Sequence, residues 1–444
     1  MNSLEKLFAK KLTENGDDAF NTTGDKLLDL LFMSEYYSKH LDEVEIDKGD
    51  IEILFSMFMR DPRFGIGRRD LGRELLKQSG ATMDEVVKCG RYDDLFVTHA
   101  NRFKDVAEYV YNRAVAGDEL AKKWLPRFNT KNDELAKRIC KVLGISQKEY
   151  RKAIKANTVE HQMSDKEFDN INFEHVPSLA MIKYYNRFMK EERFKEYLDS
   201  VKKGEKKLNV STTTVYDIYR NRDKIDADLF FDKLIEKIKI SCIPILDTSG
   251  SMWDSTDSIG KAMSIAYYLA KNSTYCNNHV VSFSSHPSLI KIKEQDYCME
   301  EDWGESYNKT NARFGTSNKF SRELNSMYTG DCSDTDFGAV ITLLGQLDEF
   351  PDYFVVLSDM EFNCGSTMSK EKVMQKLKAN NIDTKIIWWN VSNGRSKTVP
   401  ETDEYGNIFM SGYNPYLLKY LSCSFDGKKF LSKLLEEYAK NIKE

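Results

Sequence analysis

The residues best suited to chemistry lie in the sequence Asp247-Thr-Ser249-Gly-Ser251, which follows directly on a short apolar run. Alternate positions of an extended turn point the same way, so one carboxylate and two hydroxyls should converge, and Gly250 permits a tight turn. Such oxygen donors suit Mg²⁺, which takes about six oxygens at roughly 2.1 Å and usually keeps some waters. The pattern predicts half of a site for Mg²⁺ or another divalent cation such as Mn²⁺.

Two later positions can complete this cation site. Asp359 follows the apolar run at residues 353–357, and Thr335 lies in a polar loop before a predicted helix. Both residues should lie near Asp247, Ser249 and Ser251, because ligands of parallel sheets bind at the carboxyl ends of the strands. Asp336 and Glu361 would either support the ligands or be solvated acids. The alternatives are that these Ser and Asp residues cap helices without metal, or that the site folds and stays empty.

The elements that would position these residues change character along the chain. From about residue 25 to 200, apolar residues recur at helical spacing between turns with Gly or Pro, which predicts a HEAT-like α-solenoid. After residue 238, apolar strands alternate with amphipathic helices, which predicts a doubly wound, mostly parallel sheet covered on both faces. The fold class is therefore α + α/β. The predicted domains are residues 1–235 and 236–444, and a polar linker or loop lies at 202–214.

The predicted elements of the second domain can be placed individually. Strands are expected at 240–246, 280–283, 353–357 and 385–389, with helices at 258–271, 337–350 and 370–380.

Composition narrows the class of protein. No apolar run approaches the roughly 18 residues that span a bilayer, and the first residues lack the pattern of a secretory signal. The eight cysteines show no CxxC spacing, so we expect reduced thiols, no disulfide framework and a cytoplasmic location. The net charge of -5 excludes a uniformly basic protein, yet residues 101–160 hold 14 Lys or Arg against 8 Asp or Glu.

Three segments of the second half resemble the von Willebrand factor A (vWA) family. They are DTSGS at 247–251, TDFGAV at 335–340 and VLSDMEF at 356–362. The resemblance implies a metal-ion-dependent adhesion site. Asp247, Ser249, Ser251 and Thr335 would bind Mg²⁺ directly or through water, and Asp359 would supply the second carboxylate. The open coordination position would take an acidic oxygen of a protein partner.

Two segments of the first half are similar to the TROVE (Ro-type) module of ribonucleoproteins. They are FMRDPRFGIGRRDL at 58–71 and CGRYDDLF at 89–96. The resemblance implies helical repeats arranged as a ring or horseshoe, followed by a vWA domain. It also implies binding of structured or misfolded small noncoding RNA.

The candidate RNA-binding residues fall in two cationic segments. They are Arg60, Arg63, Arg68 and Arg69 in the first, and Lys122, Lys123, Arg127 and Lys131, interleaved with aromatic residues, in the second. Cationic side chains neutralise phosphates and aromatic rings stack on bases. Alternatively, the first arginines pair with Asp61, Asp70 and Glu74 to hold a turn, and residues 122–138 form a solvated helix face. Asp93 and Asp94 are expected to cap a helix.

The leading hypothesis is a non-catalytic RNA-binding scaffold whose cation site recruits a protein partner. The alternative is a protein-interaction module without RNA that clamps an acidic residue through the metal. An enzyme is not expected, because the chain has no Ser-His-Asp order, no GxxxxGK[ST] loop and no histidine cluster. The oligomeric state stays open.

Overall fold

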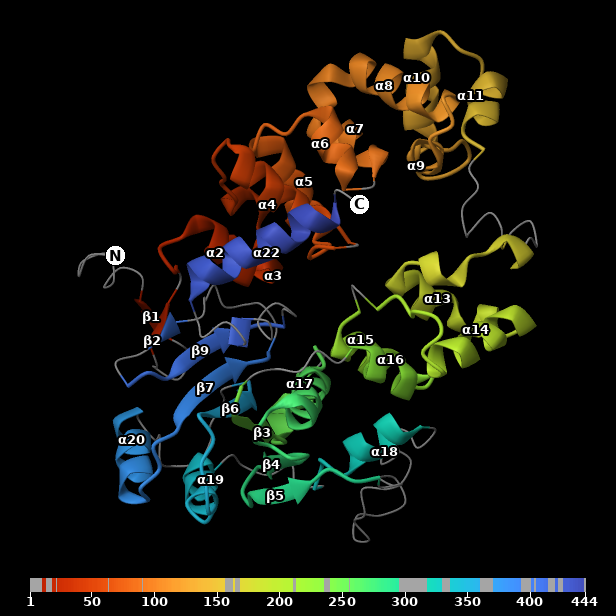
Figure 1. Ribbon diagram of the computed structural model, residues 1–444. Coiled ribbons are helices and arrows are strands. Elements are labelled where there is room, and N and C mark those ends of the chain that lie inside the picture. Colours follow the sequence, from red (N-terminus) through yellow and green to blue (C-terminus); the bar gives the residue numbers. More distant parts are fainter. Residues whose placement is uncertain are drawn as a thin grey trace. The chain divides into compact units, whose positions relative to one another are not determined.

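The structure is a computed structural model of the chain, and it divides into two compact units (Figure 1). The helical unit comprises Tyr37–Thr212 and Leu431–Glu444, and the sheet unit comprises Met1–Tyr36 and Thr213–Phe430. The residues described are 10–12, 18–20, 22–62, 64–89, 91–155, 163, 168–210, 213–234, 240–254, 256–294, 318–329, 336–359, 370–392, 401–402, 405–413, 420–421 and 426–442.

The helical unit consists of short helices joined by tight turns. Its elements are η1 (Leu41–Glu43), α4 (Asp50–Arg60), α5 (Arg69–Gln78), α6 (Met83–Lys88), η2 (Tyr92–Asp94), α7 (Leu95–Thr98), η3 (Ala100–Arg102), α8 (Phe103–Val115), α9 (Glu119–Trp124), α10 (Asp133–Leu143), α11 (Gln147–Ala153), η4 (Phe168–Asn170), η5 (Phe173–His175), α13 (Ser178–Phe188) and α14 (Glu192–Lys202).

Local sequence signals account for many of the helix ends. Capping boxes start α6 and α11, where Thr82 pairs with Glu85 and Ser146 with Glu149. Gly144 ends α10 with a left-handed φ of 65°. Along the unit, α4 contacts α5, α5 contacts α7, α8 contacts α9 and α10, and α10 contacts α11. Contacts between neighbours in sequence are typical of an α-solenoid and agree with the predicted helical half.

The sheet unit is built around one seven-stranded sheet in the order β5-β4-β3-β6-β7-β9-β8. The strands are β3 (Cys242–Asp247), β4 (His279–Phe283), β5 (Ser288–Lys291), β6 (Tyr353–Ser358), β7 (Lys385–Asn390), β8 (Glu401–Thr402) and β9 (Ile408–Ser411). Strands β5 and β8 are antiparallel to their neighbours, and the other pairs are parallel. The predicted fold class is confirmed.

The remaining elements lie wholly or partly in the sheet unit. They are β1 (Lys10–Leu12), β2 (Asp18–Phe20), α2 (Lys26–Phe32), α3 (Ser34–Tyr37), α15 (Val215–Asn221), α16 (Ala227–Leu234), η6 (Gly250–Met252), α17 (Ser258–Asn272), α18 (Lys319–Asn325), α19 (Phe337–Leu344), α20 (Lys370–Ala379) and α22 (Gly427–Asn441), of which α3 and α22 cross the division between the units. Strand β3 is buried along its whole length, as expected for a sheet covered on both faces. No helix in the described ranges has the length and apolar character needed to cross a bilayer.

The predicted elements of the second half match the observed ones within a few residues, with one clear exception. The helix expected at 337–350 ends at Leu344. Gly345 follows at the C-cap, and the chain then turns toward β6.

The compact units divide the chain earlier than the predicted boundary at 235/236. Residues 213–234 belong with the sheet because α15 packs on α17 and α16 packs on α18. The approach of α15 to α17 is close, since a Cβ atom on Gly260 would meet Cε1 of Tyr219 at 2.4 Å. The chain passes between the units after Tyr36, after Thr212 and after Phe430, and the second of these points lies within the polar segment at 202–214.

Candidate metal centre and cationic surfaces

Strands β3 and β6 bring the predicted cation ligands to one edge of the sheet. They are parallel neighbours with Leu246 opposite Leu357, so Asp247 and Ser358 end the two strands side by side. After β3 the chain moves toward β4, whereas β6 leads toward β7 on the other side. The gap between β3 and β6 is therefore the topological switch point, where open α/β sheets bind ligands.

Four oxygen-bearing side chains of the predicted set lie at this edge, and Asp247 is at their centre. It is fully buried, and its Oδ1 accepts a hydrogen bond of 2.9 Å from the backbone N–H of Ser249. The Oγ atoms of Ser249 and Ser251 lie 3.3 Å apart. Thr248 points away, since its hydroxyl donates to the carbonyl of Phe283. The alternation of side chains in the turn thus agrees with the prediction.

The electrostatics of this edge favour a bound cation. Burial, with a smaller contribution from the negative charge of Asp359, raises the pKa of the Asp247 carboxyl to about 6. Hydrogen bonds from Ser358 and Ser249 oppose this rise. Two carboxylates that feel each other's charge in a buried setting are disfavoured unless a positive charge joins them.

The donor set fits a hard divalent cation. Neighbouring ligands of an octahedral Mg²⁺ lie about 3 Å apart when each bond is roughly 2.1 Å, and the two serine oxygens are at a comparable separation. Among the described residues, no group of three or more His, Cys, Asp or Glu side chains could hold a metal ion.

Three other residues singled out from the sequence are Thr335 and Asp336, which precede α19, and Glu361, which follows β6. Thr335 and Glu361 lie outside the described residues. The backbone N–H of Asp336 donates to the carbonyl of Ser284, which places the end of the loop beside β4. The Asp336 carboxylate accepts from the N–H of Ala339 at 3.1 Å and so caps α19. Asp336 is therefore a helix cap.

Two serines at this edge were not predicted. Ser358 donates to Oδ2 of Asp247 at 2.5 Å and thereby orients the carboxylate. Ser284 follows β4, is 1% exposed, and its Oγ has no hydrogen-bond partner in the part of the chain that the structure describes. Ser358 could have been found in the sequence, because it is a polar residue at the end of an otherwise apolar strand. Ser284 is identified only by the structure, which places β4 next to β3.

In the helical unit, Arg60 is buried and does not reach a surface. Its side chain is 1% exposed, and Nη2 donates to Oδ1 of Asp94 at 2.9 Å. A side chain buried in this way cannot contact an RNA backbone, so the predicted RNA-binding role of Arg60 is corrected. The alternative, an ion pair that holds the turn, describes it better. The partner of Arg60 is not one of the acids next to it in sequence. It is Asp94, which lies 34 positions later, in the segment at 89–96.

Asp93 and Asp94 form the centre of an ion-pair cluster. Arg73 donates to Asp94 through Nε at 2.5 Å and to Asp93 through Nη2 at 3.1 Å. Arg91 makes a two-point contact with Asp93 at 2.9 and 2.7 Å. Neither carboxylate makes a cap hydrogen bond at η2 or α7, so the predicted helix cap is wrong. The segments at 58–71 and 89–96 are instead held together by ion pairs.

The other arginines of the first segment lie nearer the surface. Arg69 is about half exposed, with Nη2 3.7 Å from Oδ2 of Asp93. Burial and the nearby guanidinium groups of Arg73 and Arg91 lower the pKa of Arg69. Arg68 is half-buried where α5 begins, and Arg63 lies outside the described residues. Arg60 and Arg69 of this segment therefore pair with carboxylates of the helical unit.

Glycines explain the rest of the first segment. A Cβ atom on Gly72 would lie 2.6 Å from Cα of Arg60, so α5 can approach α4 only with glycine there. A Cβ atom on Gly65 would lie 1.9 Å from the carbonyl oxygen of Phe58. Gly67 has a left-handed φ of 71°. The glycines of this segment are thus required by a tight α4–α5 turn.

The second cationic segment is also partly neutralised. Lys122 pairs with Glu119 at 2.7 Å and is only 20% exposed. Lys123 lies with its Nζ 5.3 Å from the centre of the Trp124 ring, and the guanidinium of Arg91 lies 3.8 Å from the same ring. The contact of Arg91 joins α9 to the residue before η2, whereas the contacts of Lys122 and Lys123 lie within α9.

The two later cations of this segment differ from each other. Arg127 is half-buried, donates weakly to the carbonyl of Ile154 at 3.4 Å, and has its pKa lowered by burial. Lys131 is exposed and makes no ion pair with any described residue. Of the eight predicted RNA-binding residues, Lys131 is the one whose charge is most accessible in the described structure.

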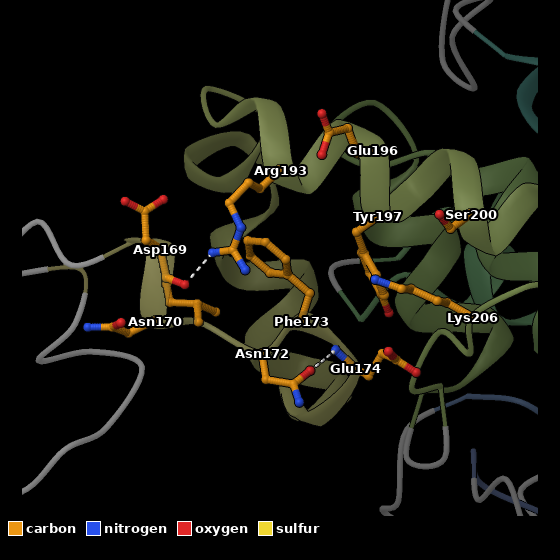
Figure 2. Close-up of a pocket in the computed structure, with 11 residues that line it drawn as sticks. Asp169, Asn170, Asn172, Phe173, Glu174, Arg193, Glu196, Tyr197, Ser200 and Lys206 are labelled. Carbon is orange, nitrogen blue, oxygen red and sulfur yellow. Dashed lines mark hydrogen bonds between the residues drawn. The ribbon is translucent and has the colours of Figure 1, made fainter.

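A pocket of about 420 Å³ lies beside η4, η5 and α14, away from every predicted site residue. Figure 2 shows Arg193 reaching the carbonyl of Asp169, to which its Nη1 donates at 2.5 Å. The lining mixes Arg193 and Lys206 with Asp169, Glu174 and Glu196. With charges of both signs and its arginine engaged by backbone, the pocket indicates no particular ligand.

Similarity to known proteins is remote. A family model described as a domain of unknown function (DUF2828) matches residues 92–236, which is less than half of the chain. An uncharacterized protein of Acanthamoeba polyphaga mimivirus is 22% identical in an alignment 525 positions long. The alignment covers 97% of this chain and 88% of the relative. The crystal structure of the Ro protein (RSR) of Deinococcus radiodurans matches with a TM-score of 0.37 and 11% identity, and covers 89% of this chain and 93% of that one. A TM-score this low carries no conclusion about function.

Proposed function

We propose that this protein is a non-catalytic scaffold with two binding surfaces. The sheet unit binds a divalent cation, Mg²⁺ or Mn²⁺, and through it an acidic group of a protein partner. The helical unit binds small structured or misfolded RNA. The observation that carries the proposal is the convergence of Asp247, Ser249, Ser251 and Asp359 at the switch point of the sheet.

The residues of the sheet edge divide the work of holding the cation. Asp247 and Asp359 supply negative charge, and Ser249 and Ser251 supply neutral oxygens. Ser358 holds Asp247 in place through its hydroxyl. Thr335 is proposed as a further ligand from the resemblance to the vWA family. The bound cation would supply a positive centre that attracts a partner's carboxylate.

The RNA-binding half of the proposal is supported by sequence and by charge. The two Ro-type segments carry the resemblance, and residues 101–160 hold a surplus of positive charge. Because Arg60 and the ion-pair cluster are structural, the contacts with RNA must lie on other cations of the helical unit. We further propose that no reaction is catalysed. RNA incubated with the protein and Mg²⁺ should stay intact.

Isothermal titration calorimetry of Mg²⁺ and Mn²⁺ into the full-length chain tests the metal half. We expect saturable binding that Asp247→Asn abolishes, because the central ligand loses its charge. Asp352→Asn, a change of equal charge at the exposed amino end of β6, should leave binding unchanged. Equal affinity of the wild type and Asp247→Asn would refute the cation site.

A protein-interaction module without RNA is the alternative. It shares the cation site and differs only in the helical unit. Binding of labelled RNA to the purified chain separates the two functions. No binding at low ionic strength, where phosphate contacts are strongest, would favour the alternative.

A further inference from the structure

We propose that the exposed face of α10 and α11 is the surface through which the helical unit binds the phosphate backbone of RNA. The inference rests on the proposed function and gives that function a location. Residues 131–155 contain eight Lys or Arg against three Asp or Glu. Figure 1 shows α10 and α11 beside α8 within the helical unit, and both helices contact α8.

Helical spacing places these cations on one face of each helix. On α11, Lys148, Arg151 and Lys152 follow the i, i+3, i+4 pattern and are exposed, whereas Tyr150 is buried. On α10, Lys137, Arg138 and Lys141 stand at positions i, i+1 and i+4 and are exposed. The buried face of α10 consists of Ala136, Ile139 and Cys140. The apolar sides are used for packing and the cationic sides are left to solvent.

The three acids of this segment are already engaged locally. Asp133 and Glu134 both pair with Lys137, at 2.7 and 2.8 Å. Glu149 accepts from the backbone and hydroxyl of Ser146 at the start of α11. The acids therefore pair with one lysine and one helix terminus, and they form no ion pair with the other cations of the face, although Asp133 lies near enough to Arg151 to feel its charge.

The unneutralised cations are held in two ways. Lys131, Lys141, Lys148 and Lys152 are exposed and form no ion pair within the described ranges. The guanidinium of Arg138 lies 3.9 Å from the centre of the Phe103 ring, and that of Arg151 lies 5.1 Å from the Phe128 ring.

An arginine held over a ring keeps its N–H groups available for an anion. Since Arg138 rests on Phe103 and Arg151 on Phe128, neither guanidinium is committed to a carboxylate of the described chain. Both can donate paired hydrogen bonds to phosphate oxygens.

The chemistry of the face fits a nucleic acid better than a membrane. Membrane-surface helices combine cations with large apolar side chains that enter the lipid. The large exposed hydrophobic residues of the described chain lie elsewhere, and none falls in residues 127–155. A row of flexible cations without an apolar centre matches a repeating polyanion, whose phosphates it can neutralise at several points.

Fluorescence anisotropy of a labelled single-stranded RNA and a labelled RNA hairpin tests the inference on the full-length chain. The variant is Lys141→Glu/Lys148→Glu/Lys152→Glu. These side chains are exposed and unpaired, so the fold should survive, which circular dichroism and thermal melting will check. We expect affinity to fall at least tenfold. The slope of log K against log salt should fall by about 2, since each contact with single-stranded RNA contributes about 0.7.

The matched control is Lys190→Glu/Lys195→Glu/Lys203→Glu, which makes the same change of charge at exposed positions around α13 and α14. It should alter affinity by less than about threefold through net charge alone. Lys141→Arg/Lys148→Arg/Lys152→Arg should retain wild-type binding, because the charges are kept.

Each failure has a different meaning. Wild-type protein that binds neither RNA at low salt would refute the proposed function and this inference together. RNA binding that the two glutamate triples weaken equally would refute the α10–α11 surface alone. Tighter binding of the wild type to phosphatidylserine vesicles than to either RNA would identify a membrane as the partner and would overturn the inference.

Discussion

Replacing Asp94 by asparagine should destabilise the helical unit more than any other isosteric change in the ion-pair cluster. Asp94 is fully buried and faces Arg60, which is 1% exposed, and Arg73, which is 12% exposed. Removing one partner of a buried ion pair typically costs about 3–5 kcal/mol, because the other charge stays buried without compensation. With two guanidiniums facing one carboxylate, we expect the loss to lie in that range.

The cluster also contains its own control. Arg69 is 47% exposed and its nitrogen lies 3.7 Å from Asp93, so it is an exposed, solvent-screened pair. Pairs of that kind contribute about 0.2–1 kcal/mol, and Arg69→Gln should cost no more. Urea denaturation at pH 7, followed by circular dichroism at 222 nm, measures both variants through the transition of the helical unit.

A double variant separates charge from packing. Arg60→Met/Asp94→Leu removes both charges together, and it should recover part of the stability that Asp94→Asn loses. If Asp94→Asn costs less than about 1 kcal/mol, or no more than Arg69→Gln, the buried pair does not join the two segments and our interpretation of the Ro-type motifs fails.

Three further outcomes follow from the contacts described. Gly72→Ala should lower stability by about 1–3 kcal/mol in urea, although alanine usually favours helices, because the new Cβ meets Arg60; a neutral result would contradict the close α4–α5 packing. Ser358→Ala should weaken Mg²⁺ binding about tenfold or more in calorimetry, since the Asp247 carboxylate loses the hydroxyl that orients it. In EDTA at pH 7.5, Asp247→Asn should melt at a higher temperature than the wild type. The pKa of Asp247 in the folded protein, about 6, exceeds its value in the unfolded chain, so the stability that this carboxyl contributes falls as the pH rises from about 4 to 6. That advantage should shrink at pH 5, and a difference independent of pH would show that Asp247 is not a strained buried acid.

Local pattern was enough to predict a mostly parallel sheet and four of its seven strands, β3, β4, β6 and β7, whereas β5, β8 and β9 were not predicted. Strands and helices were placed within a few residues because their apolar periodicity is a property of neighbouring positions. The same holds for the Asp247 turn, since a polar DxSxS sequence after a buried strand leaves its side chains at the edge of the sheet. Asp359 followed from the same argument on β6.

Ion pairs between residues far apart in the sequence could not be predicted from local pattern. Arg60 and Asp94 are 34 positions apart, and each belongs to a segment that on its own resembles a surface turn or a helix cap. Whether a cation faces solvent or is neutralised depends on which carboxylates the fold brings within about 4 Å. Periodicity within one helix does not contain that information.

The sequence by itself therefore determined the fold class and the residues at the ends of the predicted strands, because backbone periodicity is encoded locally. Only the tertiary structure decided which arginines are structural, that Ser358 orients Asp247, and that α10 and α11 carry exposed positive charge. The physical reason is that burial and ion pairing are properties of distance in space, which for these residues is set by segments far apart in the chain.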